Sequence, residues 1–483
     1  MIRGTLQQIA DWADGTLVDP ATASYPLQGV GTDTRVDLRG RLFVALKGEN
    51  FDGHAFLEQA VEQGAAAALV ETPRNDVDLP QIVVTDSRTA LARLARAWRD
   101  RVDPVVIAIT GSSGKTTVKE MLAAMLSRVG ATAATRGNLN NDIGVPLTLL
   151  DWAPETRHAV VEMGANHVGE IAQLTELVAP DIGLVTMAGR AHVGEFGSVE
   201  RIIQAKGELY RHCPAGCRAV VNLDSSGADQ WLADVPAADT FTFDQSLADR
   251  ATWLGTYRAD RHELSIRERG ESLVEALAIP MPGAHNAANL LAAIAVARLV
   301  GLEIDEIRAG LGLFEPPSGR MSTVGLGNGS RIIDDSYNAN PESMRAALAH
   351  LAGLSGLRVA VLGCMGELGD QAAVLHRDLG AEAAEAGLDQ VLAVGPDAEA
   401  VREGYLAAGG LEAGMVTAPD SGTAATALID RLTASESGPA ATILLKGSRF
   451  MHIERVREAL EREYGVAGSR TDSDKEEAGC CSG

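Results

Sequence analysis

A buried strand and a phosphate loop are encoded by one stretch, Val105-Val106-Ile107-Ala108-Ile109-Thr110-Gly111-Ser112-Ser113-Gly114-Lys115-Thr116-Thr117. The apolar run predicts a strand, and a helical pattern follows the loop. Backbone N–H groups of such a loop, together with the helix N-terminus, can cradle phosphate, while Lys115 reaches the terminal phosphates and Thr116 can ligate Mg²⁺. The standard motif has a glycine where Ile109 stands, so this loop is a shortened variant.

Strands and helices alternate on both sides of this stretch, which predicts an α/β protein. Apolar runs at 159–161, 182–185 and 219–221 predict a central, doubly wound parallel sheet, followed by a long helix from 284 to 300 that Gly301 ends. The alternation of strands and helices continues after the Pro-rich break at 314–319, with strands expected at 332–333, 359–362, 391–394 and 443–445. Shorter strands are expected before it, at 42–46, 67–70 and 82–84.

Three domains and a tail are therefore expected: 1–102, 103–316, a Rossmann-like 317–465, and a polar, disordered tail 466–483. The net charge of −23 over 483 residues excludes a general nucleic-acid binder, which needs a basic face. The sequence shows neither a run of about 20 apolar residues nor a signal-peptide pattern, so a cytoplasmic enzyme without a membrane span is expected.

The five cysteines do not form the pattern of a disulfide framework. Cys213 and Cys217 lie beside His212, but no second ligand pair accompanies them, which disfavours a zinc site. Cys480 and Cys481 fall in the predicted tail.

Only six of the 42 Lys and Arg residues are lysines, so each lysine is a candidate for work that needs a compact or reactive amine. Lys115, Lys206 and Lys446 fall in motifs. The helix that carries Lys206 begins after Ser198, a good cap, and its apolar spacing turns Lys206 inward. That lysine either snorkels along the edge of the core or faces a site. Glu162 ends a predicted strand, where a carboxylate is well placed for a metal.

From about residue 31 to residue 454 the chain resembles the Mur ligases, most closely their MurF branch. The matching segments, in order, are 32–35, 42–48, 110–117, 137–146, 162–165, 205–208, 282–289, 319–321, 334–341, 366–369 and 446–449. The phosphate loop is shared by the whole family, whereas the Asn-rich segment 137–146 and the segment 334–341 point to the MurF branch. The resemblance implies a UDP-binding domain, a central ATPase domain and a mobile C-terminal domain.

The resemblance also implies roles for single residues. It places Lys115 on the ATP phosphates, Thr116 and Glu162 on Mg²⁺, and His192 with a carbamylated Lys206 on a second Mg²⁺. The implied ATP-binding residues are Gly111, Ser112, Ser113, Gly114, Lys115, Thr116, Thr117, Asn286, Asn289, Arg320 and Asp335. The implied substrate-binding residues are Thr34 and Arg35, at the uridine end, and Asn138, Asn140 and Asn141.

The implied reaction uses ATP to activate the terminal carboxylate of a UDP-muramoyl-tripeptide as an acyl phosphate, which the amine of D-alanyl-D-alanine then attacks. A monomer is expected. Asn340 also makes a good helix start before Pro341, so capping alone could explain it. Cys364 stands where the family pattern has an acidic residue, in the loop expected to contact the dipeptide.

Two rival functions remain open at this point. One is a ligase of the same fold that adds a single amino acid or glutamate. The other is a binding protein that switches on ATP without forming a bond, although the inward Lys206 and the additional metal ligands disfavour it.

Overall fold

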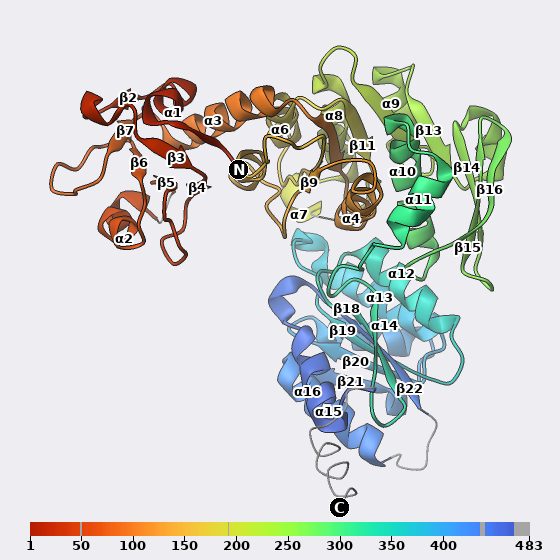
Figure 1. Ribbon diagram of the computed structural model, residues 1–483. Coiled ribbons are helices and arrows are strands. Elements are labelled where there is room, and N and C mark those ends of the chain that lie inside the picture. Colours follow the sequence, from red (N-terminus) through yellow and green to blue (C-terminus); the bar gives the residue numbers. More distant parts are fainter. Residues whose placement is uncertain (49–50, 192, 435–439, 468–483) are drawn as a thin grey trace, which may run out of the picture.

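The computed structural model describes residues 1–48, 51–191, 193–434 and 440–467. Three α/β parts follow one another along the chain (Figure 1): an N-terminal lobe at the end of a long helix, a central part, and a C-terminal part beneath it. Cys480, Cys481, His192 and most of the predicted tail lie outside the described residues. The first two residues of that tail are ordered, because Val466 bridges to Leu326 and the Ala467 N–H donates to the carbonyl oxygen of Gly325 (2.9 Å).

The N-terminal lobe is built on a five-stranded sheet of order β2-β7-β6-β5-β4, parallel except for the β2–β7 pair. A small antiparallel pair, β1–β3, packs beside it. Helix α3 begins after Asp86, whose side chain accepts the Thr89 N–H (2.7 Å), and it leads into the central part. The elements are β1 (Arg3–Thr5), α1 (Leu6–Ala13), β2 (Thr16–Leu17), β3 (Pro26–Gln28), β4 (Val30–Gly31), β5 (Leu42–Val44), α2 (Leu57–Glu62), β6 (Ala67–Val70), β7 (Gln81–Val83) and α3 (Ser87–Val102).

The central part has a nine-stranded sheet of order β16-β15-β14-β13-β12-β11-β8-β10-β9. The seven strands β8 to β14 are parallel, as expected, and the antiparallel strands β15 and β16 extend one edge. Its elements are β8 (Val105–Thr110), α4 (Lys115–Leu126), β9 (Thr132–Ala134), α5 (Gly144–Leu150), β10 (His158–Glu162), α6 (Glu170–Val178), β11 (Ile182–Val185), α7 (Val193–Phe196), α8 (Val199–His212), β12 (Arg218–Asn222), α9 (Ala228–Asp234), β13 (Asp239–Thr242), β14 (Trp253–Arg258), β15 (Glu263–Glu268), β16 (Glu271–Ala278), α10 (Ala284–Val300) and α11 (Ile304–Leu311).

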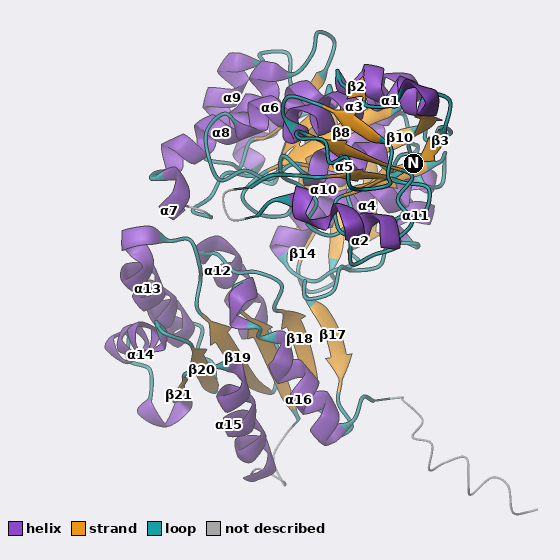
Figure 2. Ribbon diagram, turned by 90° about the vertical axis from the view of Figure 1, so that its left-hand side faces the viewer, coloured by secondary structure: helices purple, strands orange, loops and turns teal. Residues whose placement is uncertain are grey.

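The C-terminal part has a six-stranded sheet of order β17-β18-β22-β19-β20-β21, with only β17 antiparallel. Helices cover both faces of this sheet (Figure 2). Its elements are β17 (Ser322–Gly325), β18 (Arg331–Asp335), α12 (Pro341–Ala352), β19 (Leu357–Gly363), α13 (Ala372–Glu385), β20 (Gln390–Val394), α14 (Ala398–Ala407), β21 (Met415–Ala418), α15 (Ser421–Ala434), β22 (Ala441–Lys446) and α16 (Glu454–Tyr464).

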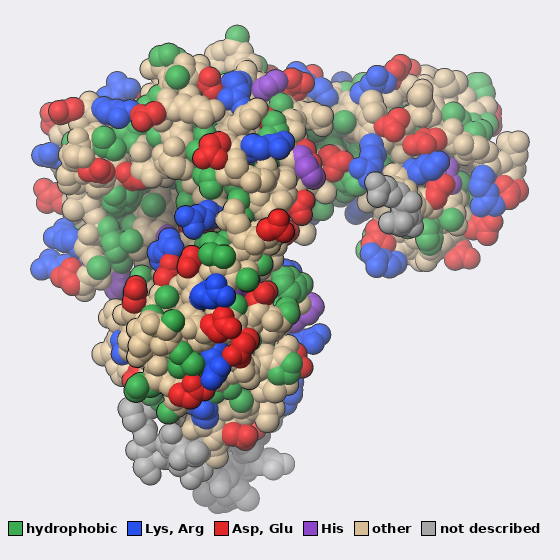
Figure 3. All heavy atoms as spheres, turned by 180° about the vertical axis from the view of Figure 1, so that it is seen from behind, with side chains coloured by type: hydrophobic (Ala, Val, Ile, Leu, Met, Phe, Trp, Pro, Cys, Tyr) green, Lys and Arg blue, Asp and Glu red, His purple; other side chains and the backbone are tan. Residues whose placement is uncertain are grey.

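The predicted α/β class is confirmed, and apolar runs located the strands well because the central strands are buried on both faces. Helix α10 has the predicted bounds, and Gly301 ends it in the left-handed conformation (φ 101°) that glycine adopts freely. None of the helices among the described residues is long and apolar enough to cross a membrane. Basic and acidic side chains are mixed over the face that Figure 3 shows, so that face has no basic stripe for nucleic acid.

Candidate active site

A cavity of about 1300 Å³ lies between the central and C-terminal parts. Loops at the carboxyl ends of strands from both sheets line it, including the phosphate loop after β8 and the loops after β18, β19 and β22. Ligands of open α/β sheets collect at these strand ends. In this chain the carboxyl-end edges of the central and C-terminal sheets therefore face the same cavity.

The phosphate loop needs glycine at two positions. A Cβ on Gly111 (φ 146°) would stand 2.0 Å from Thr186 Oγ1, and a Cβ on Gly114 (φ 84°) would stand 2.3 Å from Asn289 Oδ1. Helix α4 begins at Lys115, whose Nζ donates to the Gly111 carbonyl oxygen (2.7 Å). Burial lowers the pKa of Lys115 below its ordinary value. The predicted order of strand, loop and helix is confirmed.

Thr116, Glu162 and Asn140 form an oxygen-rich group beside this loop. Thr116 Oγ1 donates to Glu162 Oε2 (2.9 Å), and Asn140 Nδ2 donates to Glu162 Oε1 (2.9 Å). Glu162 is only 3% exposed and ends β10, the strand next to β8. A hydroxyl and a carboxylate at this distance are the oxygen donors that Mg²⁺ prefers, so the side chains fit a magnesium nucleotide.

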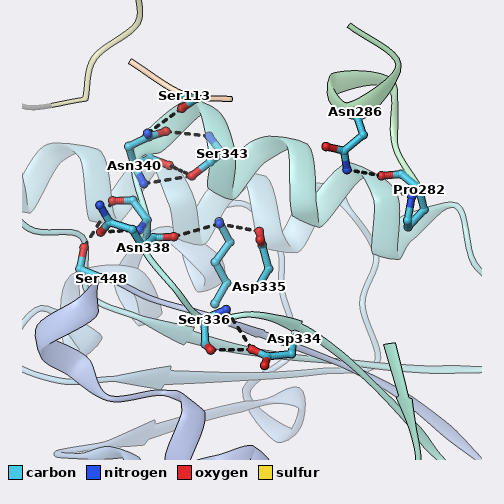
Figure 4. Close-up of polar contacts among 12 residues, drawn as sticks. Ser113, Pro282, Asn286, Asp334, Asp335, Ser336, Asn338, Asn340, Ser343 and Ser448 are labelled. Atoms are coloured by element: carbon cyan, nitrogen blue, oxygen red, sulfur yellow. Dashed lines mark hydrogen bonds and ion pairs between the residues drawn. The ribbon is translucent and has the colours of Figure 1, made fainter. Parts of the chain in front are cut away.

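Two residues of the C-terminal part reach the phosphate loop. Arg320 Nη2 donates to Thr116 Oγ1 (3.1 Å), and its Cζ lies 4.4 Å from the centre of the Tyr337 ring. Asn340 Nδ2 donates to Ser113 Oγ (2.9 Å), while its Oδ1 accepts the Ser343 N–H and caps α12 (Figure 4). Capping is therefore only part of what Asn340 does.

Asp335 lines the same cavity and is paired with Lys446. Lys446 Nζ donates to Asp335 Oδ2 (2.6 Å) and to the Asn338 carbonyl oxygen (3.1 Å). The lysine ends β22 and the aspartate ends β18, the neighbouring strand, so the pair ties two strand ends together. Figure 4 shows Asp335 below Asn340 and Ser343, which mark the start of α12.

Asn286 and Asn289 share one face of α10, as predicted. Asn289 Nδ2 donates to Asn286 Oδ1 (3.2 Å), and Asn286 Nδ2 donates to the Pro282 carbonyl oxygen (2.7 Å). Both line the cavity, as do His285 and Ala288 of the same turn of the helix. Burial lowers the pKa of His285 to about 4, so this imidazole is neutral at pH 7.

Lys206 faces the cavity, which settles the alternative left open by its helical spacing. Ser198 caps α8 as predicted, and Lys206 is 2% exposed. Its Nζ lies 3.5 Å from the Ala165 carbonyl oxygen, a long hydrogen bond, and 5.4 Å from the centre of the Phe196 ring. Burial, and secondarily the charge of Lys115, lowers the pKa of Lys206 to about 7.

The predicted substrate residues fall into two groups. Asn138, Asn140 and Asn141 line the cavity, and Asn141 Oδ1 also accepts the Gly144 N–H at the start of α5 (2.8 Å). Thr34 and Arg35 lie in the N-terminal lobe and are not among the residues that line it. Thr34 donates to Gln59 Oε1 (2.8 Å), whereas the exposed Arg35 pairs with Asp33 (2.7 Å).

The sequence reasoning missed several cavity residues. Glu342, in the first turn of α12, accepts the Arg190 N–H with Oε1 (3.0 Å). Arg449 and Phe450, in the loop after β22, also line the cavity. Arg449 closes the matched segment 446–449, and this was the only signal in the sequence that pointed to either of these two residues.

The three cysteines that the structure describes are not among the residues that line this cavity. Cys213 and Cys217 form a disulfide, a short-range pair rather than a framework, and His212 contacts Glu176 (2.9 Å). Cys364 is buried under its own sheet, where its Sγ donates to the Val394 carbonyl oxygen (3.3 Å). The residues of its loop that line the cavity are Gly366 and Glu367, whereas Cys364 itself does not line it.

The buried Cys364 and His376 and the half-buried Asp397 together have the residue types of a metal site. Both ring nitrogens of His376 are already used, however. Nε2 accepts the Met365 N–H (2.8 Å), and Nδ1 donates to the Ala372 carbonyl oxygen (2.7 Å). This histidine is a structural support for the loop after β19.

Three family models match the chain: the Mur ligase middle domain over 109–297, the Mur ligase glutamate ligase domain over 319–449, and the Mur ligase family catalytic domain over 26–99. The UDP-N-acetylmuramoyl-tripeptide–D-alanyl-D-alanine ligase of Escherichia coli (strain K12) is 41% identical over 462 residues, which cover 95% of this chain and 99% of the relative.

Solved structures agree with the sequence comparison. A crystal structure of MurF from Acinetobacter baumannii superposes with a TM-score of 0.87 at 35% identity and covers 96% of this chain and 99% of that one. MurF from Thermotoga maritima, solved in complex with ADP, has a TM-score of 0.76 at 28% identity over 90% of this chain and 97% of that one. The chain therefore belongs to the Mur ligase family.

Proposed function

We propose that this chain is the ATP-dependent ligase that joins D-alanyl-D-alanine to UDP-N-acetylmuramoyl-tripeptide, giving the UDP-muramoyl-pentapeptide, ADP and phosphate. The observation that carries the proposal is the cavity in which Arg320 and Asn340 of the C-terminal part contact Thr116 and Ser113 of the phosphate loop. The 41% identity to a ligase of this name, over nearly the whole of both chains, selects this reaction among those of the family.

Each part of the chain has its own role in the reaction. Residues 1–102 hold the UDP end of the substrate through Thr34 and Arg35, residues 103–316 hold ATP, and residues 317–465 bring the dipeptide. The ATP phosphates are surrounded by the phosphate loop, which contributes Gly111, Ser112, Ser113, Gly114, Lys115 and Thr117. Asn286 and Asn289 approach adenine, with Arg320 and Asp335 on the nucleotide from the other side. Asn138, Asn140 and Asn141 guide the peptide end of the substrate toward Glu162.

Activation of the carboxylate is the central chemical problem, because a carboxylate at neutral pH is a poor electrophile. Its oxygen attacks the γ-phosphorus of ATP, ADP leaves, and an acyl phosphate forms. Negative charge spreads over the transferring group, so Lys115 and Arg320 hold the charged oxygens from two sides of the cavity. The amine of the dipeptide then attacks the acyl carbon, loses a proton, and phosphate leaves with the oxygen that came from the carboxylate.

Thr116 and Glu162 would hold Mg²⁺, which supplies positive charge at the γ-phosphate. For a second Mg²⁺ we propose His192 together with Lys206 as a carbamate. Lys206 supports this because its amine is buried, lines the cavity and has only a long hydrogen bond to Ala165 among the described residues. Its lowered pKa leaves neutral amine that can react with CO₂. The anion so formed suits a divalent ion better than an ammonium group.

Two assays test the proposal. ADP release should require ATP, UDP-muramoyl-tripeptide and D-alanyl-D-alanine together, and equal release with a single amino acid in place of the dipeptide would favour the rival ligase. For the carbamate, Lys206→Ala should be inactive and should partly recover with added short carboxylic acids. A fully active Lys206→Ala enzyme would exclude that role. We further propose that the enzyme is a cytoplasmic monomer, which sedimentation of the purified chain and fractionation of its cells would test.

A further inference from the structure

We propose that the loop after β22 forms the subsite for the incoming dipeptide, with Arg449 binding its carboxylate and Phe450 packing against its methyl groups. This assignment rests on the proposed function, because it concerns the second substrate of that reaction. D-Alanyl-D-alanine offers only three features for recognition beyond its backbone: an ammonium group, two methyl groups and one carboxylate. A subsite for it needs a cation beside a small apolar surface.

The other described cations of the cavity wall are already engaged or lie on the central part. Lys115 donates within the phosphate loop, and Arg320 donates to Thr116. Lys446 is 3% exposed and paired with Asp335. Lys206 is buried against Phe196 on the central side. Each of these four cations is therefore already hydrogen-bonded, paired or buried.

Arg449 differs from them in exposure and in its partner. Its side chain is 65% exposed, and the Glu454 carboxylate lies 3.4 Å from Nη1. An exposed ion pair of this kind contributes little to stability, so Arg449 can readily exchange Glu454 for another carboxylate. The guanidinium is thus available to form the bidentate bond with a carboxylate that its geometry favours.

The loop that carries Arg449 is held rigidly. Ser448 Oγ accepts the Gly366 N–H (2.8 Å) and donates to the Ala339 carbonyl oxygen (3.3 Å). These bonds tie the loop after β22 to the loops after β19 and β18. A binding group on a fixed loop loses little conformational freedom when its ligand arrives, which favours affinity.

Phe450 supplies the apolar surface. Its side chain is 56% exposed although it lines the cavity. The ring covers Gly366, where a Cβ would stand 3.0 Å from the ring atom Cε1. A methyl group of the dipeptide that packs on this ring removes apolar area from water on both partners. Cation and apolar ring are adjacent in the sequence, which matches the adjacent methyl and carboxylate of a C-terminal alanine.

The position of Arg449 also favours a dipeptide over a single amino acid as the nucleophile. Arg449 and Arg320 lie near the same Tyr337 ring, with their Cζ atoms 6.0 and 4.4 Å from its centre. Arg320 marks the reacting end, because it donates to Thr116. Two residues of extended chain span about 7 Å and one spans about half as much. A dipeptide anchored at Arg449 therefore extends its amine farther toward the reacting end than a single amino acid does.

Steady-state kinetics with a matched substrate test this assignment. Arg449→Ala should raise the KM for D-alanyl-D-alanine roughly 10- to 100-fold, the range for loss of a charge-assisted hydrogen bond. The KM values for ATP and UDP-muramoyl-tripeptide should stay the same, and Arg449→Lys should restore part of the loss. Arg455→Ala, which removes an exposed arginine of the same domain away from the cavity, is the control.

The carboxamide of D-alanyl-D-alanine provides the decisive comparison. The parent enzyme should use it as poorly as Arg449→Ala uses the dipeptide, and Arg449→Ala should not distinguish the two. Phe450→Ala should weaken both substrates equally. An Arg449→Ala enzyme that still prefers the carboxylate overturns the assignment while the parent ligates normally. A parent enzyme that consumes no ATP with the dipeptide overturns the proposed function itself.

Discussion

Arg320, at the start of the C-terminal part, donates a hydrogen bond through Nη2 to Oγ1 of Thr116, 204 residues earlier in the chain. Thr116 in turn donates to Glu162. One continuous set of polar contacts thus links the C-terminal part to the end of β10 through the phosphate loop. The two halves of the active site are assembled by side chains at their interface.

Replacement of Arg320 should therefore damage catalysis more than binding. We expect Arg320→Ala to lower kcat by roughly 10²- to 10³-fold, as for other groups that stabilise developing charge, with a smaller change in the KM for ATP. Arg308→Ala removes an exposed arginine of α11 that pairs with Asp305, and it should leave both parameters unchanged. Equal kcat in the Arg320→Ala and Arg308→Ala enzymes would contradict this role.

Lys115→Arg should disable the enzyme although the charge is kept. The loop folds closely around Lys115, whose Nζ donates to Gly111, and a planar guanidinium does not occupy the same position as a compact ammonium. We expect a loss of at least about 100-fold in kcat/KM, measured as ADP release. Activity within about threefold of the parent would show that Lys115 does not contact the transferring phosphoryl group.

The buried amine of Lys206 should make the stability of the folded chain depend on pH. Its pKa is about 7 in the folded chain against an ordinary 10.5, so unfolding takes up a proton between these values and stability rises with pH across that window. Burial of the amine costs a few kcal/mol at pH 7 and below. Lys206→Met should therefore melt at a higher temperature than the parent at pH 7 in CO₂-free buffer, and this advantage should shrink at pH 9.

Lys119 is the matched control for that measurement. It is as buried as Lys206, but its Nζ donates to the Thr135 carbonyl oxygen (2.6 Å) and pairs with Glu120 (2.7 Å). Lys119→Met should lower the melting temperature because it leaves these acceptors without a donor. The account of Lys206 fails if both variants shift the melting temperature in the same direction.

Much of the fold could be predicted because a strand that is buried on both faces consists of a continuous run of apolar residues. β6, β8 and β11 and the helix α10 were located within a residue or two. β9, with the sequence Thr132-Ala133-Ala134, has too few apolar side chains to be recognised, and it becomes a strand only by pairing with β10.

The site was predictable only in its local parts. The phosphate loop, the shared face of Asn286 and Asn289, and the inward Lys206 follow from spacing along the chain. The contact of Asn340 with Ser113 spans 227 residues and depends on how the domains pack, which no local pattern encodes. The same holds for Arg449, whose significance comes from the cavity it faces.

The most direct test of the central claim follows oxygen from the substrate. UDP-muramoyl-tripeptide labelled with ¹⁸O in its terminal carboxylate is incubated with the enzyme, ATP and D-alanyl-D-alanine, and the released phosphate is analysed by mass spectrometry. The account predicts one ¹⁸O atom in each phosphate, released in step with UDP-muramoyl-pentapeptide, because the carboxylate oxygen attacks the γ-phosphorus of ATP. Pentapeptide formed together with unlabelled phosphate would contradict activation through an acyl phosphate.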